Sequence, residues 1–159
     1  MSQTEKTTIV FFSGDLDKAI AAFIIANGAA AYGHEVTIFF TFWGLNALRK
    51  DQPVSVRKGF LETMFGKLMP RGANKLKLSK MNFAGIGPKL IKHVMKKHNA
   101  LSLSQLIELA REQGVKLVAC TMTMDLLGLK KEELIDGIDY AGVATYLGEA
   151  AEAKVNLFI

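Results

Sequence analysis

The chain has 159 residues, of which half are apolar and 22% are charged. This length suits one domain, and the apolar content supports a sizeable core and excludes a disordered chain. The net charge is +5, and the single cysteine excludes an intrachain disulfide and any metal site built from several cysteines.

The sequence predicts a cytoplasmic protein. Its first six residues are polar and lack the apolar stretch that is typical of a signal peptide. The longest weakly polar run, residues 19–33, contains Asn27 and falls short of the roughly 20 apolar residues that span a bilayer. We therefore expect a buried helix there and a reducing compartment for the lone thiol.

The first 41 residues predict a strand–helix–strand unit. Residues 7–12 and 36–41 are β-branched, aromatic and almost continuously apolar, as in strands that are covered on both faces. Residues 16–32 predict a helix that follows a turn at Ser13 and Gly14, with Asp15 as its cap. Such a unit has a right-handed crossover and parallel strands. A short helix begins near residue 45.

The strand–helix alternation breaks between residues 53 and 99. Residues 60–68 have helical spacing, residues 75–78 alternate like an exposed edge strand, and residues 88–98 predict a basic amphipathic helix. We interpret approximately residues 53–99 as a basic insertion between the second and third strands of a single domain that covers residues 1–159. It either packs on the sheet or forms a lid or docking surface.

Residues 57–98 contain eleven Lys or Arg residues and one acid, Glu62. A solvated face is the simplest interpretation of this charge. Nucleic-acid binding would also produce it, but the segment has no recognition motif and few aromatic residues, so we predict no nucleic-acid partner. The methionine content favours docking to an acidic protein or to a peripheral, anionic membrane surface.

The alternation resumes after residue 103. Residues 104–113 predict an amphipathic helix, residues 115–119 a buried strand, and residues 123–127 and 132–136 short helices. A brief strand at 140–142, a helix at 143–151 and a strand at 155–159 complete the chain. The predicted fold class is therefore α/β, with a mostly parallel sheet of about five strands and helices on both faces.

Cys120 follows the third predicted strand, at the edge where open α/β sheets bind ligands. A helix that begins after it would present N–H groups and partial positive charge to a thiolate. Asp125 would oppose this effect if its carboxylate pointed toward the sulfur. A lone cysteine at the end of a buried strand is more often an inert core residue, so both interpretations stay open.

The neighbours of Cys120 exclude several cysteine chemistries. A phosphatase-like or rhodanese-like loop has Arg five or six residues after the cysteine, where this chain has Asp125 and Leu126. A typical peroxidase has Thr three residues before it, where this chain has Leu117. No histidine follows a strand as the base of a cysteine protease would. A persulfide relay needs only one nucleophilic cysteine and no general base.

Other candidate binding residues follow the first two strands. Gly14 and Asp15 follow the first strand, but without a dinucleotide-binding or phosphate-binding motif. Phe42 and Trp43 follow the second strand and could form the wall of a pocket near Cys120. Packing in the core or at a subunit interface is the alternative for both aromatic residues.

Neither a metal nor a cofactor is predicted. His93 and His98 are five residues apart, so they do not share a helix face as a zinc pair at a spacing of four would. Residues 85–89 could form an anion-binding turn, but a helix start with Pro88 as its first residue explains them better.

Residues 115–128, VKLVACTMTMDLLG, closely resemble the DsrE-like sulfur-relay family, in particular its DsrE2 branch. Residues 78–85, 133–137 and 156–159 also resemble that branch. The motif Cys-x-Met-x-Met-Asp is far more specific than a lone cysteine. Thr123 stands where the family pattern has serine, and threonine retains the hydroxyl group.

The resemblance implies a three-layer α/β/α domain and a sulfurtransferase or sulfur-carrier role, with a persulfide on Cys120. It also implies homo-oligomers or assembly with related subunits, and donor and acceptor proteins with reactive thiols. In this interpretation Thr121, Thr123 and backbone N–H groups stabilise the thiolate or persulfide, while Met122 and Met124 form an apolar wall. Whether the protein turns over as an enzyme stays open.

Two other functions stay open. A non-catalytic binding module would hold a small ligand at the sheet edge and dock a partner through the basic insertion, and it would retain function in a Cys120→Ala variant. A redox sensor would instead form a sulfenate on Cys120 under peroxide.

Overall fold

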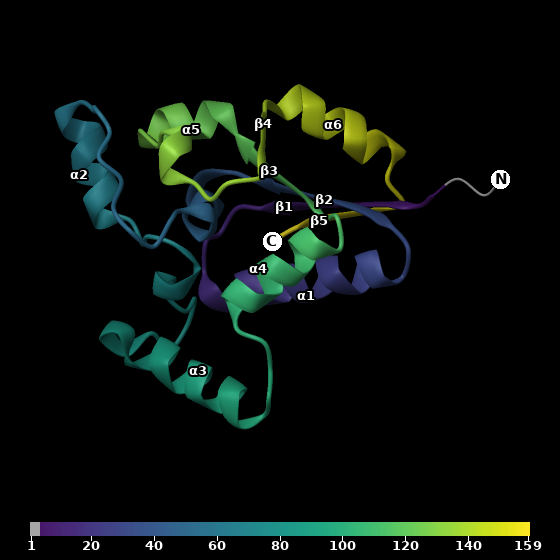
Figure 1. Cartoon of the computed structure of the whole chain (residues 1–159), viewed down its shortest axis with the longest axis horizontal. Coiled ribbons are helices and arrows are strands. Elements are labelled where there is room, and N and C mark those ends of the chain that lie inside the picture. Colours follow the sequence, from purple (N-terminus) through teal and green to yellow (C-terminus); the bar gives the residue numbers. More distant parts are fainter. Residues whose placement is uncertain (1–3) are drawn as a thin grey trace.

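The computed structural model describes residues 4–159, which form a five-stranded sheet with helices on both faces (Figure 1). The strand order is β4-β3-β2-β1-β5, and every neighbouring pair is parallel. The strands are β1 (Lys6–Phe11), β2 (Glu35–Phe40), β3 (Lys116–Cys120), β4 (Asp139–Ala141) and β5 (Val155–Phe158). The α/β class with a parallel sheet, predicted from the alternation of strands and helices, is confirmed.

Helices cover both faces of the sheet (Figure 1). Helices α1 (Leu16–Ala31) and α4 (Leu103–Glu112) lie on one face, and α5 (Thr121–Leu127) and α6 (Val143–Glu152) lie on the other. Because successive strand residues point to opposite faces, β2 and β3 each contribute side chains to two separate clusters. The main core faces α1 and α4 and includes the strand residues Ile9, Phe11, Ile38, Phe40, Leu117 and Ala119.

Helix α1 packs closely on the sheet because its buried side includes small residues such as Ala19, Ala22 and Ala26. Both polar groups of the buried Asn27 side chain form hydrogen bonds. Its Nδ2 donates to the Leu106 carbonyl oxygen at 3.0 Å, and its Oδ1 accepts from Gln113 Nε2 at 2.8 Å. Burying this amide is tolerated because its hydrogen bonds join α1 to α4.

The segment between β2 and α4 leaves the sheet. It contains a 3-10 helix (Phe42–Leu48), then α2 (Phe60–Leu68), two short 3-10 helices (Ala73–Lys75 and Phe83–Gly85) and α3 (Ile86–Lys97). Helix α2 lies beside α5, whereas α3 extends on the side of α1 and α4 (Figure 1). The helices predicted at 60–68 and from residue 88 are confirmed.

The edge strand predicted at residues 75–78 is wrong. Within residues 4–159, this stretch joins no strand of the sheet. Leu76 is instead buried in the main core, and the Lys77 carbonyl oxygen accepts from the Leu16 backbone N–H at 2.8 Å. The alternating pattern therefore arises because this extended chain lies across the start of α1.

Helix α3 exposes the apolar side chains of Ile86, Leu90 and Val94, and the neighbouring Met81 and Phe83 are also exposed. Three of its lysines, Lys89, Lys96 and Lys97, are exposed as well, and Lys92 is half-buried. Across residues 4–159, no helix combines the length and the apolar character that crossing a membrane requires.

Candidate functional site

The loops that follow β1 and β2 meet at the carboxyl edge of the sheet, because parallel strands end on the same side. Gly14 has φ +67°, and a β-carbon at this position would lie 2.3 Å from the Trp43 carbonyl oxygen. The close approach of the two loops therefore requires glycine at position 14.

Cys120 is the last residue of β3, and its side chain faces the α5/α6 side of the sheet. It is only 3% exposed and packs in a small cluster with Phe39, Val118, Ala141 and Tyr146. The Tyr146 ring of α6 stacks on Phe39, with ring centroids 5.1 Å apart and planes inclined by 29°. In this conformation a partner molecule reaches the thiol only after this cover moves.

Threonine hydroxyl groups hold the turn around Cys120. Thr123 Oγ1 donates to the Cys120 carbonyl oxygen at 3.2 Å and lies 3.3 Å from Thr41 Oγ1, which donates to it. Thr121 Oγ1 donates to the Ala141 carbonyl oxygen at a long 3.5 Å. Both hydroxyls therefore bond to backbone rather than to sulfur here, and they connect the turn after β3 to Thr41, which follows β2, and to the last residue of β4.

The two methionines of the motif point in different directions. Helix α5 begins at Thr121, and residues two apart on a helix do not share a face. Met122 is 61% exposed, whereas Met124 is buried in the main core rather than in the Cys120 cluster. The structure therefore does not bring them together beside the sulfur.

The other predicted binding residues lie at the same edge but outside the Cys120 cluster. Asp15 precedes α1 and pairs locally, with its Oδ2 3.0 Å from Lys18 Nζ. Phe42 packs on Phe12 with ring centroids 5.4 Å apart, and Trp43 is 43% exposed. An exposed indole at this edge is available to a ligand or partner.

The imidazole groups lie away from Cys120, as predicted. His34 is at the amino end of the sheet, where its Nδ1 is 2.8 Å from Thr7 Oγ1 and its Nε2 is 3.2 Å from Glu5 Oε2. The other two histidines belong to α3 and its end. Among residues 4–159, no group of three His, Cys, Asp or Glu side chains is arranged to hold a metal ion.

Tyr140 is the titratable neighbour on β4. Burial raises the pKa of its hydroxyl, and the carboxylates of Asp136 and Glu132 add to the effect. The Lys131 ammonium group lies 4.6 Å from its ring centroid. Tyr140 is therefore neutral at pH 7 and adds no negative charge beside the Cys120 strand.

Tyr146 and Thr41 belong to the surroundings of Cys120, although the sequence did not single them out. Tyr146 supplies the aromatic cover, and Thr41 supplies the bond from the end of β2. The aromatic residue on a short amphipathic helix was the available signal for the first. A threonine after a buried strand gave no comparable signal for the second.

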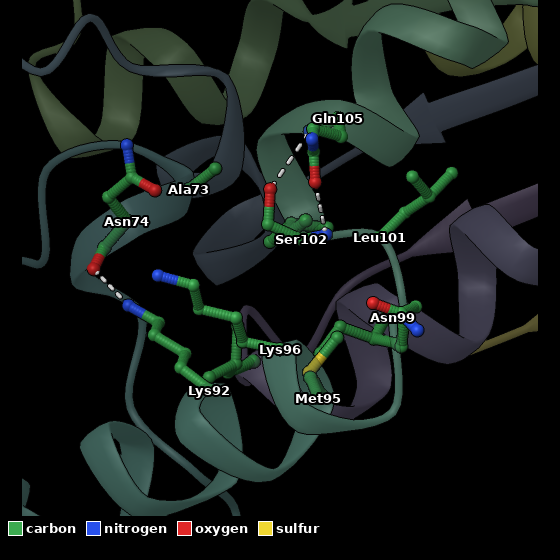
Figure 2. Close-up of a pocket in the computed structure, with 13 residues that line it drawn as sticks. Ala73, Asn74, Lys92, Met95, Lys96, Asn99, Leu101, Ser102 and Gln105 are labelled. Atoms are coloured by element: carbon green, nitrogen blue, oxygen red, sulfur yellow. Dashed lines mark hydrogen bonds between the residues drawn. The ribbon is translucent and has the colours of Figure 1, made fainter.

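A separate cavity of about 460 Å³ lies between α3 and α4 (Figure 2). Figure 2 shows Lys92 donating to the Asn74 carbonyl oxygen, at 2.6 Å, and the paired hydrogen bonds of Ser102 and Gln105 that begin α4. Because α4 covers the face opposite α6, the sheet separates this cavity from Cys120.

Comparisons with known proteins identify the family and the fold. The model of the DsrE/DsrF/DrsH-like family matches residues 3–158. The chain is 75% identical over 157 residues to the uncharacterized protein YrkE of Bacillus subtilis (strain 168), covering 99% of this chain and 98% of that protein. It is 38% identical over 164 residues to the sulfur carrier protein DsrE2 of Allochromatium vinosum, covering 99% of each.

Two solved structures share the fold. One is MTH1491 from Methanobacterium thermoautotrophicum, a protein of unknown function, with a TM-score of 0.55 at 13% identity over 98% of this chain and 99% of that one. The other is the YchN protein from E. coli, with a TM-score of 0.55 at 12% identity over 97% and 99%. At such identities the likeness concerns the fold alone.

Proposed function

The chain belongs to the DsrE/DsrF/DrsH-like family, and from this premise we propose that it is a sulfur carrier that holds sulfane sulfur as a persulfide on Cys120. Family membership and a sulfur-carrier relative over the full length support a sulfur-relay role in general. The observation that carries the finer proposal is the position of the only cysteine at the carboxyl end of β3, within the motif that the family resemblance rests on.

The proposed reaction is two successive thiol exchanges. The Cys120 thiolate attacks the terminal sulfur of a donor persulfide, a new S–S bond forms, and the donor leaves as a thiolate with the electron pair of the broken bond. An acceptor thiolate then attacks the terminal sulfur on Cys120, which leaves as the thiolate. The sulfane sulfur moves without net oxidation, so no redox cofactor is needed.

The surroundings of Cys120 define what must move. Helix α6, all of whose residues are described, buries none of its side chains, so displacing it or turning Tyr146 disturbs little of the core. Once the sulfur is open, the long bond of Thr121 to Ala141 is the one that most easily redirects its hydroxyl toward a thiolate or persulfide. The first backbone N–H groups of α5 supply further donors.

The partners in this proposal are donor and acceptor proteins with reactive thiols in the cytoplasm. Exposed apolar residues on α6 and β5 offer a face for assembly with further copies: Val143, Leu147, Val155 and Phe158. Docking of an acidic protein or an anionic membrane surface to the basic insertion stays a prediction. Helix α3 would serve this docking because it has both exposed apolar side chains and lysines.

The test is sulfur loading measured by intact mass. After incubation with a sulfane donor, the wild-type chain should gain the mass of one sulfur atom, and dithiothreitol should remove it. The Cys120→Ser variant keeps the size of the residue and should gain nothing. A wild-type chain that stays unmodified under conditions that load a known carrier would contradict the proposal.

The burial of Cys120 is the specific observation in favour of a non-catalytic binding module. In that case the exposed Trp43 and the edge around it would bind the partner, and the thiol would only fill space. A Cys120→Ala variant that still supports function in cells would favour this alternative, because a carrier loses its function with its sulfur.

A further inference from the structure

A second cavity, of about 530 Å³, lies beside α2, between the chain at residues 53–58 and the chain at 66–77. Its lining contains one carboxylate, from Glu133, and an unusual gathering of five cationic side chains: Lys58, Lys67, Arg71, Lys75 and Lys77. Like charges around one cavity repel, more weakly at the exposed Lys67, Lys75 and Lys77 than at the partly buried Arg71, so this arrangement needs a physical explanation.

Glu133 does not supply that explanation, because its carboxylate is already fully engaged. It is 2% exposed, and its Oε2 lies 2.5 Å from Lys58 Nζ and accepts from the Lys130 backbone N–H at 2.9 Å. Its Oε1 lies 3.9 Å from Arg49 Nη2. In the described chain, none of the other four lining cations has a carboxylate oxygen within 4.0 Å.

Arg49 adds a further positive charge directly behind the cavity wall. Its side chain is completely buried, and it donates to carbonyl oxygens of residues that line the cavity, Gly66 at 2.9 Å and Pro70 at 3.2 Å. These acceptors are neutral. Burial lowers the pKa of the Arg49 guanidinium, and the neighbouring positive charge of Arg71 lowers it further, against the opposing effect of Glu133.

Arg71 lines the cavity and carries an unused hydrogen-bond donor. Its Nη1 is shielded from solvent and has no hydrogen-bond partner among residues 4–159, and Nε of the fully buried Arg49 is likewise unpaired. Leaving a buried charged donor unpaired is costly, so such groups in native proteins usually bond to ordered water, an ion or a ligand.

We propose that this cavity binds a small molecule with at least two negative charges on oxyanion groups, held by Arg71 and the three lining lysines that have no carboxylate partner. Arginine pairs with phosphate, sulfate-type and carboxylate groups through two parallel hydrogen bonds. The volume falls in the range of about 300–1,000 Å³ that is typical of small-molecule sites. Pro53, Val54 and Val56 form an apolar wall for the rest of the ligand.

A small ligand fits this site better than a nucleic acid or a membrane. The cations line a concave cavity of about 530 Å³, and a bulky polyanion lying on the surface does not enter it. The proposal does not depend on the role of Cys120, because none of the lining residues belongs to the Cys120 cluster. The two proposals therefore succeed or fail separately.

The test is thermal unfolding and calorimetric titration of the full chain with pyrophosphate, thiosulfate and citrate, with sodium chloride at the same ionic strength. At least one of these anions should raise the melting temperature with saturation, because a ligand that binds only the folded state stabilises it. A preference for pyrophosphate indicates a phosphate ligand, one for thiosulfate a sulfur oxyanion, and one for citrate a polycarboxylate; each supports the proposal.

Arg71→Gln should weaken binding at least tenfold. It should leave the unliganded chain as stable as wild type or more stable, because it removes repulsion against Arg49. Lys97→Gln, on α3 outside the cavity, makes the same change in net charge and should bind as wild type does. A Lys75→Gln, Lys77→Gln double variant provides a second measurement if Arg71→Gln does not fold.

Three outcomes would overturn the proposal. One is equal stabilisation by chloride at matched ionic strength, which would show general screening only. Another is an equal loss of binding in Arg71→Gln and Lys97→Gln. The third is binding to anionic vesicles or single-stranded DNA with none to the small anions, which would make the cations a surface for a macromolecule.

Discussion

The two faces of the sheet are covered very differently: we call the face under α1 and α4 the closed face and the face under α5 and α6 the open face. Helix α1 buries six of its residues, including Leu16 and Phe23, against the sheet and α4. Helix α6 buries none of its side chains, and only the partly buried Tyr146 packs on the cluster beneath it. The comparison indicates that the α1/α4 layer stabilises the fold, while Cys120 lies under α6, a helix whose displacement costs little free energy.

The largest expected effect is at Phe23 on the closed face. Its side chain is fully buried, and its ring centroid lies 6.1 Å from that of Phe40. Phe23→Ala should reduce the free energy of unfolding by about 3–5 kcal/mol, through lost burial and the cavity that remains. Urea unfolding followed by circular dichroism measures this loss. A loss below about 1 kcal/mol would mean that this layer is not the main source of stability.

An intermediate effect is expected at Tyr146 on the open face. Tyr146→Ala removes the stacking on Phe39 and should cost about 1–2 kcal/mol, less than Phe23→Ala. Because the same ring covers the Cys120 cluster, the alkylation rate of Cys120 should rise about tenfold, the factor that corresponds to 1.4 kcal/mol. Intact mass after timed exposure to iodoacetamide measures the rate.

Tyr32→Ala is the matched control, because Tyr32 is exposed at the end of α1 and does not belong to the Cys120 cluster. Its alkylation rate should equal that of wild type. If Tyr146→Ala reacts no faster than Tyr32→Ala, the thiol is reached by another route and α6 is not its cover.

Most of the fold was predictable because each central strand is apolar on both faces and each helix has a distinct boundary. Cys120 could be placed at the carboxyl edge because it directly follows a predicted parallel strand, and all parallel strands of a sheet end at the same edge. The prediction failed at residues 75–78. The alternation of polar and apolar residues there reflects the burial of Leu76 and gives no information about a neighbouring strand.

The contacts around the sites were less predictable because they depend on orientation in space. The first turn of α5 sends Met122 and Met124 to different sides, and only the actual start of the helix determines this. The cationic cavity was hidden for another reason. Charge counting treats Arg49 and Lys97 alike, although the first is completely buried and the second is exposed.

The smallest effect on stability is expected at Leu147, and it tests what the open face is for. Leu147 of α6 and Ile24 of α1 are both 57% exposed, so replacing either by Gln should change the free energy of unfolding by no more than about 0.5 kcal/mol. If α6 and β5 form the proposed contact between copies, Leu147→Gln should lower the molar mass measured by light scattering, and Ile24→Gln should not. Equal masses in both variants and in the wild type would remove α6 from the interface, and a reduced mass in Ile24→Gln alone would place the contact on the closed face instead.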